Sequence, residues 1–252
     1  MDIKLLLMMP LAFVCEFIDS SLGMGYGTSL TPILLLMGFS PLQVVPCVLF
    51  SEFVTGITSA FFHHSVHNVN FKPKSKDTRI ALALSVFSVI GTVAAVVLAI
   101  KLPGNILKIW IGAIVVGMGI FILVTFNRIP RFTWRKIIAF GAVASFNKGL
   151  SGGGYGPLVM GGQILSGVGV KNAVGITSLA EGLTCFVGVI AYFMMKTNID
   201  WSLAPWLMAG AVLSVPFAAH TLKALTEKKV KVIIAVLMIV LGALTLAKVF
   251  FK

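Results

Sequence analysis

Apolar stretches of this chain contain Asp19, Glu52, Lys148 and Glu181, and an uncompensated charge is costly there. Glu16 lies one helical turn before Asp19, and we expect it to line the same site with weaker support. A buried lysine can bind an anion or pair with a carboxylate, and a buried carboxylate can bind and release a proton. We therefore predict that Lys148 binds an anionic substrate and that Glu52, Glu181 and Asp19 serve proton coupling. Two alternatives stay open, a lysine that extends to the surface and glutamates that hold backbone N–H groups.

Asp19 and Lys148 each stand just before a glycine-rich segment. Residues 152–157 contain four glycines and one proline, which cannot continue an α-helix, and residues 19–28 are a weaker copy. N–H groups freed at such breaks, and the positive ends of the helices that follow, favour a small anion. The alternative is that the glycines only permit close helix packing. The predicted substrate-binding residues are Lys148, Asn147, Ser151, Gly153, Gly154, Tyr155, Ser20, Ser21, Gly25, Tyr26 and Thr28.

The two breaks belong to an internal duplication. Without gaps, a shift of 129 residues places ten residues of the range 17–55 on identical residues. These are Phe17, Gly23, Gly25, Tyr26, Gly27, Leu36, Gly38, Val45, Glu52 and Thr55. The same shift places Asp19 on Lys148. Because positions related by a pseudo-twofold axis lie close together at that axis, we predict that Asp19 pairs with Lys148 in the empty protein, or that Lys148 binds the substrate's charge.

The composition predicts a polytopic α-helical membrane protein. The chain is 58% hydrophobic and 11% charged, and its mean hydropathy is +1.02. Residues 1–20 run into the first break without a cleavage pattern and are interpreted as part of the first span. The net charge of +12 comes from basic residues clustered in loops, which indicates membrane orientation rather than nucleic-acid binding. The three isolated cysteines predict buried free thiols, with no metal site and no cofactor.

The apolar segments predict ten helices, five in each half. The expected ranges are 3–22, 28–38, 41–62, 80–100, 105–126, 137–150, 157–166, 171–194, 202–222 and 232–250. Basic loops at 63–79, 127–136 and 223–231 are assigned to the cytoplasm. If each short helix counts as a crossing, each half crosses five times and the halves are inverted, with both termini outside. The predicted domains are residues 1–126 and 137–252, joined by a cytoplasmic linker at 127–136.

The chain resembles the sulfite exporter TauE/SafE family over nearly its whole length. The resemblance rests on residues 23–28 followed by Pro41 and Glu52, and on residues 147–157 followed by residues 171–173 and Glu181. It implies export of sulfite, sulfoacetate or related sulfur-containing anions across a membrane. That family is usually drawn with seven or eight spans, whereas the count above gives ten.

Inverted repeats with interrupted helices are typical of secondary transporters, whose binding site lies where the broken helices meet. We expect a proton-coupled secondary transporter, and specifically an exporter, of a small sulfur-containing anion in the cell inner (plasma) membrane. The alternatives are an anion channel, a transporter of another small anion, or an intramembrane scaffold or enzyme. No nucleophile–base pair or ATPase motif is present, so we do not expect an enzyme. The expected partners are the anion, a proton or other coupling ion, and the lipid bilayer, with a homo-oligomer possible and no nucleic acid.

Overall fold

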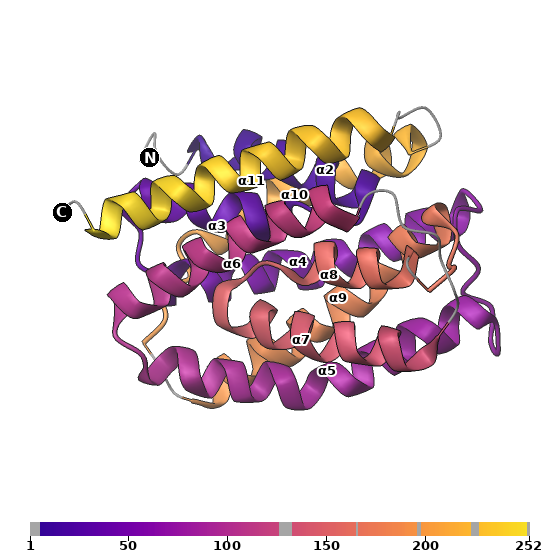
Figure 1. Cartoon of the computed structure of the whole chain (residues 1–252), viewed down its shortest axis with the longest axis horizontal. Coiled ribbons are helices and arrows are strands. Elements are labelled where there is room, and N and C mark those ends of the chain that lie inside the picture. The colour runs from indigo at the N-terminus through magenta and orange to yellow at the C-terminus, as the bar shows by residue number, and fades with distance from the viewer. Residues whose placement is uncertain (1–5, 126–132, 165, 196–197, 223–226, 251–252) are drawn as a thin grey trace.

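The computed structural model describes residues 6–125, 133–164, 166–195, 198–222 and 227–250 (Figure 1). Its described elements are all helices, which lie side by side along a common direction. They are α2 (Met8–Leu22), α3 (Tyr26–Leu36), α4 (Pro41–Ser65), α5 (Lys76–Lys101), α6 (Gly104–Thr125), α7 (Trp134–Ser151), α8 (Tyr155–Ile164), α9 (Val170–Met194), α10 (Ala204–Thr221) and α11 (Glu227–Phe250).

The predicted helices are confirmed, and most boundaries agree within a few residues. Most of the proposed linker at 127–136, and part of the basic loop at 223–231, lie outside the described residues. The three cysteines are buried free thiols, as expected. Four of the described helices are long and apolar enough to cross a membrane, namely α4, α5, α9 and the Gly104–Phe121 part of α6. The chain is a membrane protein whose outer helices expose large apolar side chains such as Ile90, Met194 and Phe250.

The two breaks begin with the same backbone conformation. Gly23 ends α2 and Gly152 ends α7, each with φ of 70°. The N–H of Gly23 donates to the carbonyl of Asp19, and the N–H of Gly152 donates to the carbonyl of Lys148. A left-handed residue is favourable only for glycine at such a helix end. The duplication seen in the sequence is therefore also a duplication of local structure.

The two breaks pack directly against each other at glycine positions. A Cβ added to Gly27 would collide with the carbonyl oxygen of Gly152. In the mirrored contact, a Cβ added to Gly156 would lie 2.5 Å from the carbonyl oxygen of Gly23. The segments containing Tyr26 and Tyr155 therefore meet in the interior, and glycine is required because backbone touches backbone there.

Two pairs of corresponding helices, α4 with α9 and α6 with α11, pack antiparallel to each other. Along the crossing of α4 and α9, Ser59 lies beside Ser178, whereas Gly56 lies beside Gly182. Residue numbers therefore rise in α4 as they fall in α9. The same holds for α6 and α11, where Gly112 faces Leu246 and Gly119 faces Ala235. The contacts of α2 with α10 are likewise repeated by those of α7 with α5.

The short helix α3 returns toward the end of the molecule at which α2 begins. Helix α2 runs parallel to α4, because Glu16 bonds Thr55 and Ser20 bonds Ser59. Helix α3 runs antiparallel to α4: its first residue, Tyr26, bonds Ser51, and residues 37–40 link its end to the start of α4. The expected count of five crossings per half, which treats α3 as a crossing, therefore disagrees with these helix directions. The breaks reverse the chain because glycine allows it to turn within three residues.

The contact between the breaks predicts the effect of one added methyl group. In Gly156→Ala the new Cβ would also lie 2.8 Å from the Cα of Met24, so backbone must move. We expect a loss of about 1–3 kcal/mol in the free energy of unfolding, measured as a lower melting temperature of the purified protein. Gly117→Ala is the control, because no atom lies within 4 Å of its added Cβ. Equal melting temperatures for the two variants would contradict the contact.

Candidate functional site

The centre of the molecule contains a lysine held by two glutamates. Lys148 is fully buried, and its ammonium group forms ion pairs with the carboxylates of Glu52 and Glu181. The bond from its Nζ to Oε1 of Glu181 is 2.6 Å long. A lysine without exposed surface must be compensated by nearby carboxylates, because burying a lone ammonium is costly. The reading of Lys148 as a lysine that extends to the surface is therefore excluded in this structure.

Three helices bring these charges together. Lys148 lies in the last turn of α7, just before the break at Gly152. Glu52 and Glu181 lie near the middle of α4 and α9, which cross where Gly56 contacts the backbone of Gly182. The absence of side chains at this crossing lets the two helices approach closely, so the two repeat-related glutamates reach the same ammonium group.

Carboxylates also cap the first break. The N–H of Tyr26 donates to Oδ1 of Asp19 at 3.1 Å, and the N–H of Gly27 donates to Oε1 of Glu52 at 3.3 Å. These are the N–H groups that the start of α3 leaves without helical partners. Glu52 thus holds a helix break, as the structural alternative predicted, and also pairs with Lys148.

The second break is not capped in the same way. Lys148 stands where the first half has Asp19, and Glu181, the counterpart of Glu52, pairs with the lysine instead. Among the described residues, no side-chain carboxylate accepts a hydrogen bond from the N–H groups of Tyr155 or Gly156. The start of α8 therefore presents donors and a positive helix end next to the lysine, which is the side of the site that suits an anion.

A small polar pocket lies between the two breaks, and it is closed in this conformation, because its volume of about 0 Å³ leaves no room for a water molecule. It is lined by Asp19, Gly25, Gly27, Thr28, Lys148, Gly153, Gly154, Gly156, Pro157 and Glu181. The hydroxyl group of Thr28 is buried and has no hydrogen-bond partner. A buried hydroxyl without a partner is unfavourable, so it indicates a position where a ligand could supply the missing bond. Donors from both breaks thus face one space.

A second small cavity adjoins the same carboxylates. It is lined by Glu16, Asp19, Glu52, Thr55, Gly56, Ser59, Ser178 and Glu181. Glu16 accepts hydrogen bonds from Ser20 at 2.6 Å and from Thr55 at 3.2 Å. The hydroxyls of Ser20, Ser59 and Ser178 continue this network, with 3.1 Å between neighbours. Together the two cavities hold four carboxyl groups and one lysine.

Most of the predicted residues converge here, with one change of partner. Lys148, Asp19, Glu52, Glu181, Gly25, Thr28, Gly153 and Gly154 line these two cavities. Lys148 pairs with Glu52 and Glu181, whereas the sequence had suggested Asp19. Asp19 instead caps α3 from within the same pocket, because its carboxylate is the one nearest to the freed N–H of Tyr26.

The remaining predicted residues do not line the two cavities, and among them the buried hydroxyl of Tyr155 has no hydrogen-bond partner. Ser151 bonds the carbonyl of Asn147 and the N–H of Gly153, within its own break. Tyr26 bonds Ser51 at 2.8 Å, and Ser21 lies 3.5 Å from the carbonyl of Ala218. Ser20 belongs to the hydroxyl network, Asn147 lies beside Gly154, and Tyr155 is fully buried in the core.

The site also includes four residues with weak sequence signals, Glu16, Thr55, Ser59 and Ser178. Glu16 has no acidic counterpart, because the repeat shift places it on Ser145. The available signal was its position one helical turn before Asp19, on the same face of the helix. Thr55 is one of the residues that recur in the duplication, but serine and threonine are weak signals in general, because they commonly bond their own helix in membrane proteins.

Comparisons with known proteins agree with a transporter. The family model described as "Sulfite exporter TauE/SafE" matches residues 8–245. The chain is 26% identical over 259 residues to "Probable membrane transporter protein YtnM" of Bacillus subtilis, covering 96% of this chain and 83% of that protein. It is 27% identical over 214 residues to "Probable membrane transporter protein MJ0441" of Methanocaldococcus jannaschii, covering 79% and 77% of the two chains. No solved structure matches significantly.

The buried ion pairs predict a strongly destabilised lysine variant. Lys148→Met leaves two buried carboxylates without a cation, and we expect a loss of about 3–5 kcal/mol in the free energy of unfolding. The triple variant Lys148→Met/Glu52→Gln/Glu181→Gln buries none of these three charges and should recover much of that loss. Thermal unfolding in detergent measures both, with Lys136→Met on the exposed face of α7 as the control. A triple variant no more stable than Lys148→Met would contradict the pairing.

Proposed function

This chain belongs to the sulfite exporter TauE/SafE family, and we propose that it exports a small sulfur-containing anion, such as sulfite or an organosulfonate. Transport occurs across the cell inner (plasma) membrane by alternating access and is coupled to protons. The observation that carries the proposal is the fully buried Lys148, which lies between two broken helices. The export direction and the sulfur chemistry rest on the description of the family.

The substrate takes the place of one or both glutamates on Lys148. A sulfite or sulfonate group offers three oxygen atoms, which match the ammonium group, the hydroxyl of Thr28 and the N–H groups at the start of α8. These donors come from both halves of the chain, so their arrangement depends on how the halves meet. Binding between two moving halves is what alternating access requires.

Proton coupling follows from the balance of charge. Among the residues that the structure describes, Lys148 is the only basic side chain lining the two cavities, which also contain four carboxyl groups. When an anion occupies Lys148, Glu52 and Glu181 lose their counter-charge in a buried place. Because an unpaired buried charge is costly, the released carboxyl groups bind protons. The anion and the proton therefore occupy the site together, and they cross the membrane in the same direction.

The antiparallel pairing of α4 with α9 and of α6 with α11 supports two inverted repeats, residues 1–126 and 137–252, joined through 127–136. In this proposal the first half crosses the membrane with α4, α5 and α6, and α2 with α3 forms a re-entrant pair. The second half crosses with α9, α10 and α11, and α7 with α8 forms its re-entrant pair. Three is an odd number, so the halves remain inverted although α3 and α8 do not cross. The loops at 63–79, 127–136 and 223–231 then share the cytoplasmic side.

The first test removes the anion-binding charge. We expect Lys148→Ala to reduce uptake of sulfite or sulfoacetate into proteoliposomes to the protein-free level, because the anion loses its only cation. The triple variant described above provides a folded protein without that charge and should be equally inactive. Lys136→Gln, an exposed lysine on the same helix, should transport normally.

Binding is measured separately with purified wild-type protein. A thermal-shift panel of sulfite, sulfoacetate, taurine, thiosulfate and sulfate should show a raised melting temperature for the transported anion, because a ligand that binds only the folded state stabilises it. The shift should disappear in the triple variant. In the uptake test of the preceding paragraph, unchanged transport by Lys148→Ala would refute the proposed site.

The second test follows the protons. Sulfoacetate is fully ionised at neutral pH, so its entry into proteoliposomes should acidify a lumen that contains a pH-sensitive dye. We expect Glu52→Gln/Glu181→Gln to abolish this acidification, because no carboxyl group remains to be released from Lys148. Asp200→Asn, an exposed loop carboxylate, is the matched control. Sulfoacetate flux without acidification in the wild type would indicate an anion channel and contradict coupling.

A further inference from the structure

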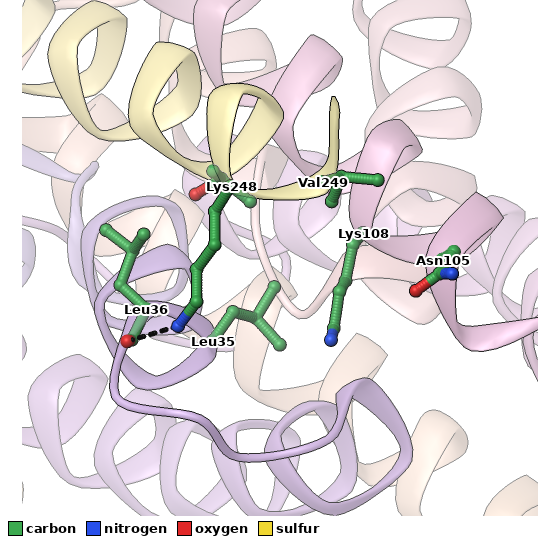
Figure 2. Close-up of a pocket in the computed structure, with 7 residues that line it drawn as sticks. Leu35, Leu36, Asn105, Lys108, Lys248 and Val249 are labelled. Carbon is green, nitrogen blue, oxygen red and sulfur yellow. Dashed lines mark hydrogen bonds between the residues drawn. The ribbon is translucent and has the colours of Figure 1, made fainter. Parts of the chain in front are cut away.

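A third cavity, lined by two lysines, lies apart from the two central cavities. It has a volume of about 410 Å³ and is lined by Leu35, Leu36, Asn105, Lys108, Thr245, Lys248 and Val249. Figure 2 shows the lysine side chains extending from α11 and α6 toward the end of α3. It shares no lining residue with the two central cavities.

The two lysines make this cavity strongly positive. The ammonium group of Lys248 donates a hydrogen bond of 2.7 Å to the carbonyl oxygen of Leu36, the last residue of α3 (Figure 2). This bond caps a negative helix end. Among the described residues, Lys108 has no hydrogen-bond or ion-pair partner, and no acidic side chain lines the cavity. One of the two positive charges therefore remains available to a ligand.

The duplication does not explain this cavity. The repeat shift of 129 residues places Lys108 on Leu237, and it places Lys248 on Gly119. Neither lysine has a basic counterpart in the other half. The cavity therefore occurs at one end of the molecule only, opposite the basic loop at 63–79, and is separate from the repeated machinery at the centre.

The position of the cavity indicates the kind of ligand. Lys108 stands in the second turn of α6 and Lys248 in the last turn of α11, so both lie at the end of long apolar helices. In a membrane-spanning helix, such a position is close to the lipid headgroups. Leu35 and Val249 give the cavity apolar walls. Ile106 and Phe250 beside it are 47% and 67% exposed on the outer surface. Cations next to apolar surface suit a charged headgroup whose acyl chains lie alongside the helices.

We propose that this cavity binds the phosphodiester headgroup of an anionic phospholipid. The headgroup phosphate accepts hydrogen bonds from Lys108, Lys248 and the amide of Asn105. The acyl chains then lie along the exposed apolar side chains of α6 and α11. A bound lipid of this kind holds the end of α3 against α6 and α11, which are the helices that contact each other most extensively across the two halves.

Native mass spectrometry of the purified protein with added phosphatidylglycerol tests the site. We expect the wild type to retain one phosphatidylglycerol per chain and to bind phosphatidylcholine more weakly. Lys108→Gln should weaken phosphatidylglycerol binding about five-fold, and adding Lys248→Gln should weaken it about five-fold again. Lys248 also caps the end of α3, so the double variant could fold poorly. In that case the single variant Lys108→Gln, which keeps this cap, still tests the lipid site.

Lys101→Gln is the matched control, because this lysine is exposed at the same end of the molecule and does not line the cavity. An equal loss of phosphatidylglycerol binding in Lys101→Gln would overturn the proposal. So would equal binding of phosphatidylglycerol and phosphatidylcholine by the wild type. Displacement of phosphatidylglycerol by millimolar inorganic phosphate or sulfite would assign the cavity to a free oxyanion instead. None of these results depends on the transport role of Lys148.

Discussion

The buried ion pairs of Lys148 with Glu52 and Glu181 are the constraint on which the rest of this structure depends. An ammonium group with no exposed surface requires carboxylates within bonding distance, and those carboxylates come from two different helices and from both halves of the chain. Glu52 of the first half has its cation in the second half, where Lys148 also pairs with Glu181. The charges therefore fix how α4, α7 and α9 meet, and they place a polar site in the middle of an otherwise apolar molecule.

Glycine makes this meeting possible. The breaks approach each other with carbonyl oxygens and Cα atoms in contact, as at Gly27 with Gly152 and at Gly156 with Gly23. The same residues turn the chain back, so that α3 and α8 end on the side from which α2 and α7 came. Backbone groups freed by the turns are satisfied by Asp19 and Glu52 in the first half and left facing Lys148 in the second. The two halves share a shape but differ in charge.

That difference gives the proposed function its chemistry. A symmetric site with two aspartates would repel an anion, and a symmetric site with two lysines would hold one too tightly to release. Asp19 and Lys148 at equivalent positions, together with Glu16 and the two paired glutamates, leave one cation among four carboxyl groups. In the proposed function, such a site accepts an anion together with the protons that neutralise the carboxylates. The proposed lipid cavity at Lys108 and Lys248 is separate from these central charges. The lipid proposed to bind there holds the end of α3 against α6 and α11.

The sequence by itself determined the helices, the two breaks, the duplication and the charges that meet at the centre. These are local properties: apolar length fixes a helix, a run of glycines ends it, and a charge in an apolar stretch must be compensated. The partners of Lys148 and the turn of α3 back beside α4 were decided only by the tertiary structure. They depend on the crossing of α4 and α9 at Gly56 and Gly182, and a contact between residues 126 positions apart leaves no trace in the local pattern.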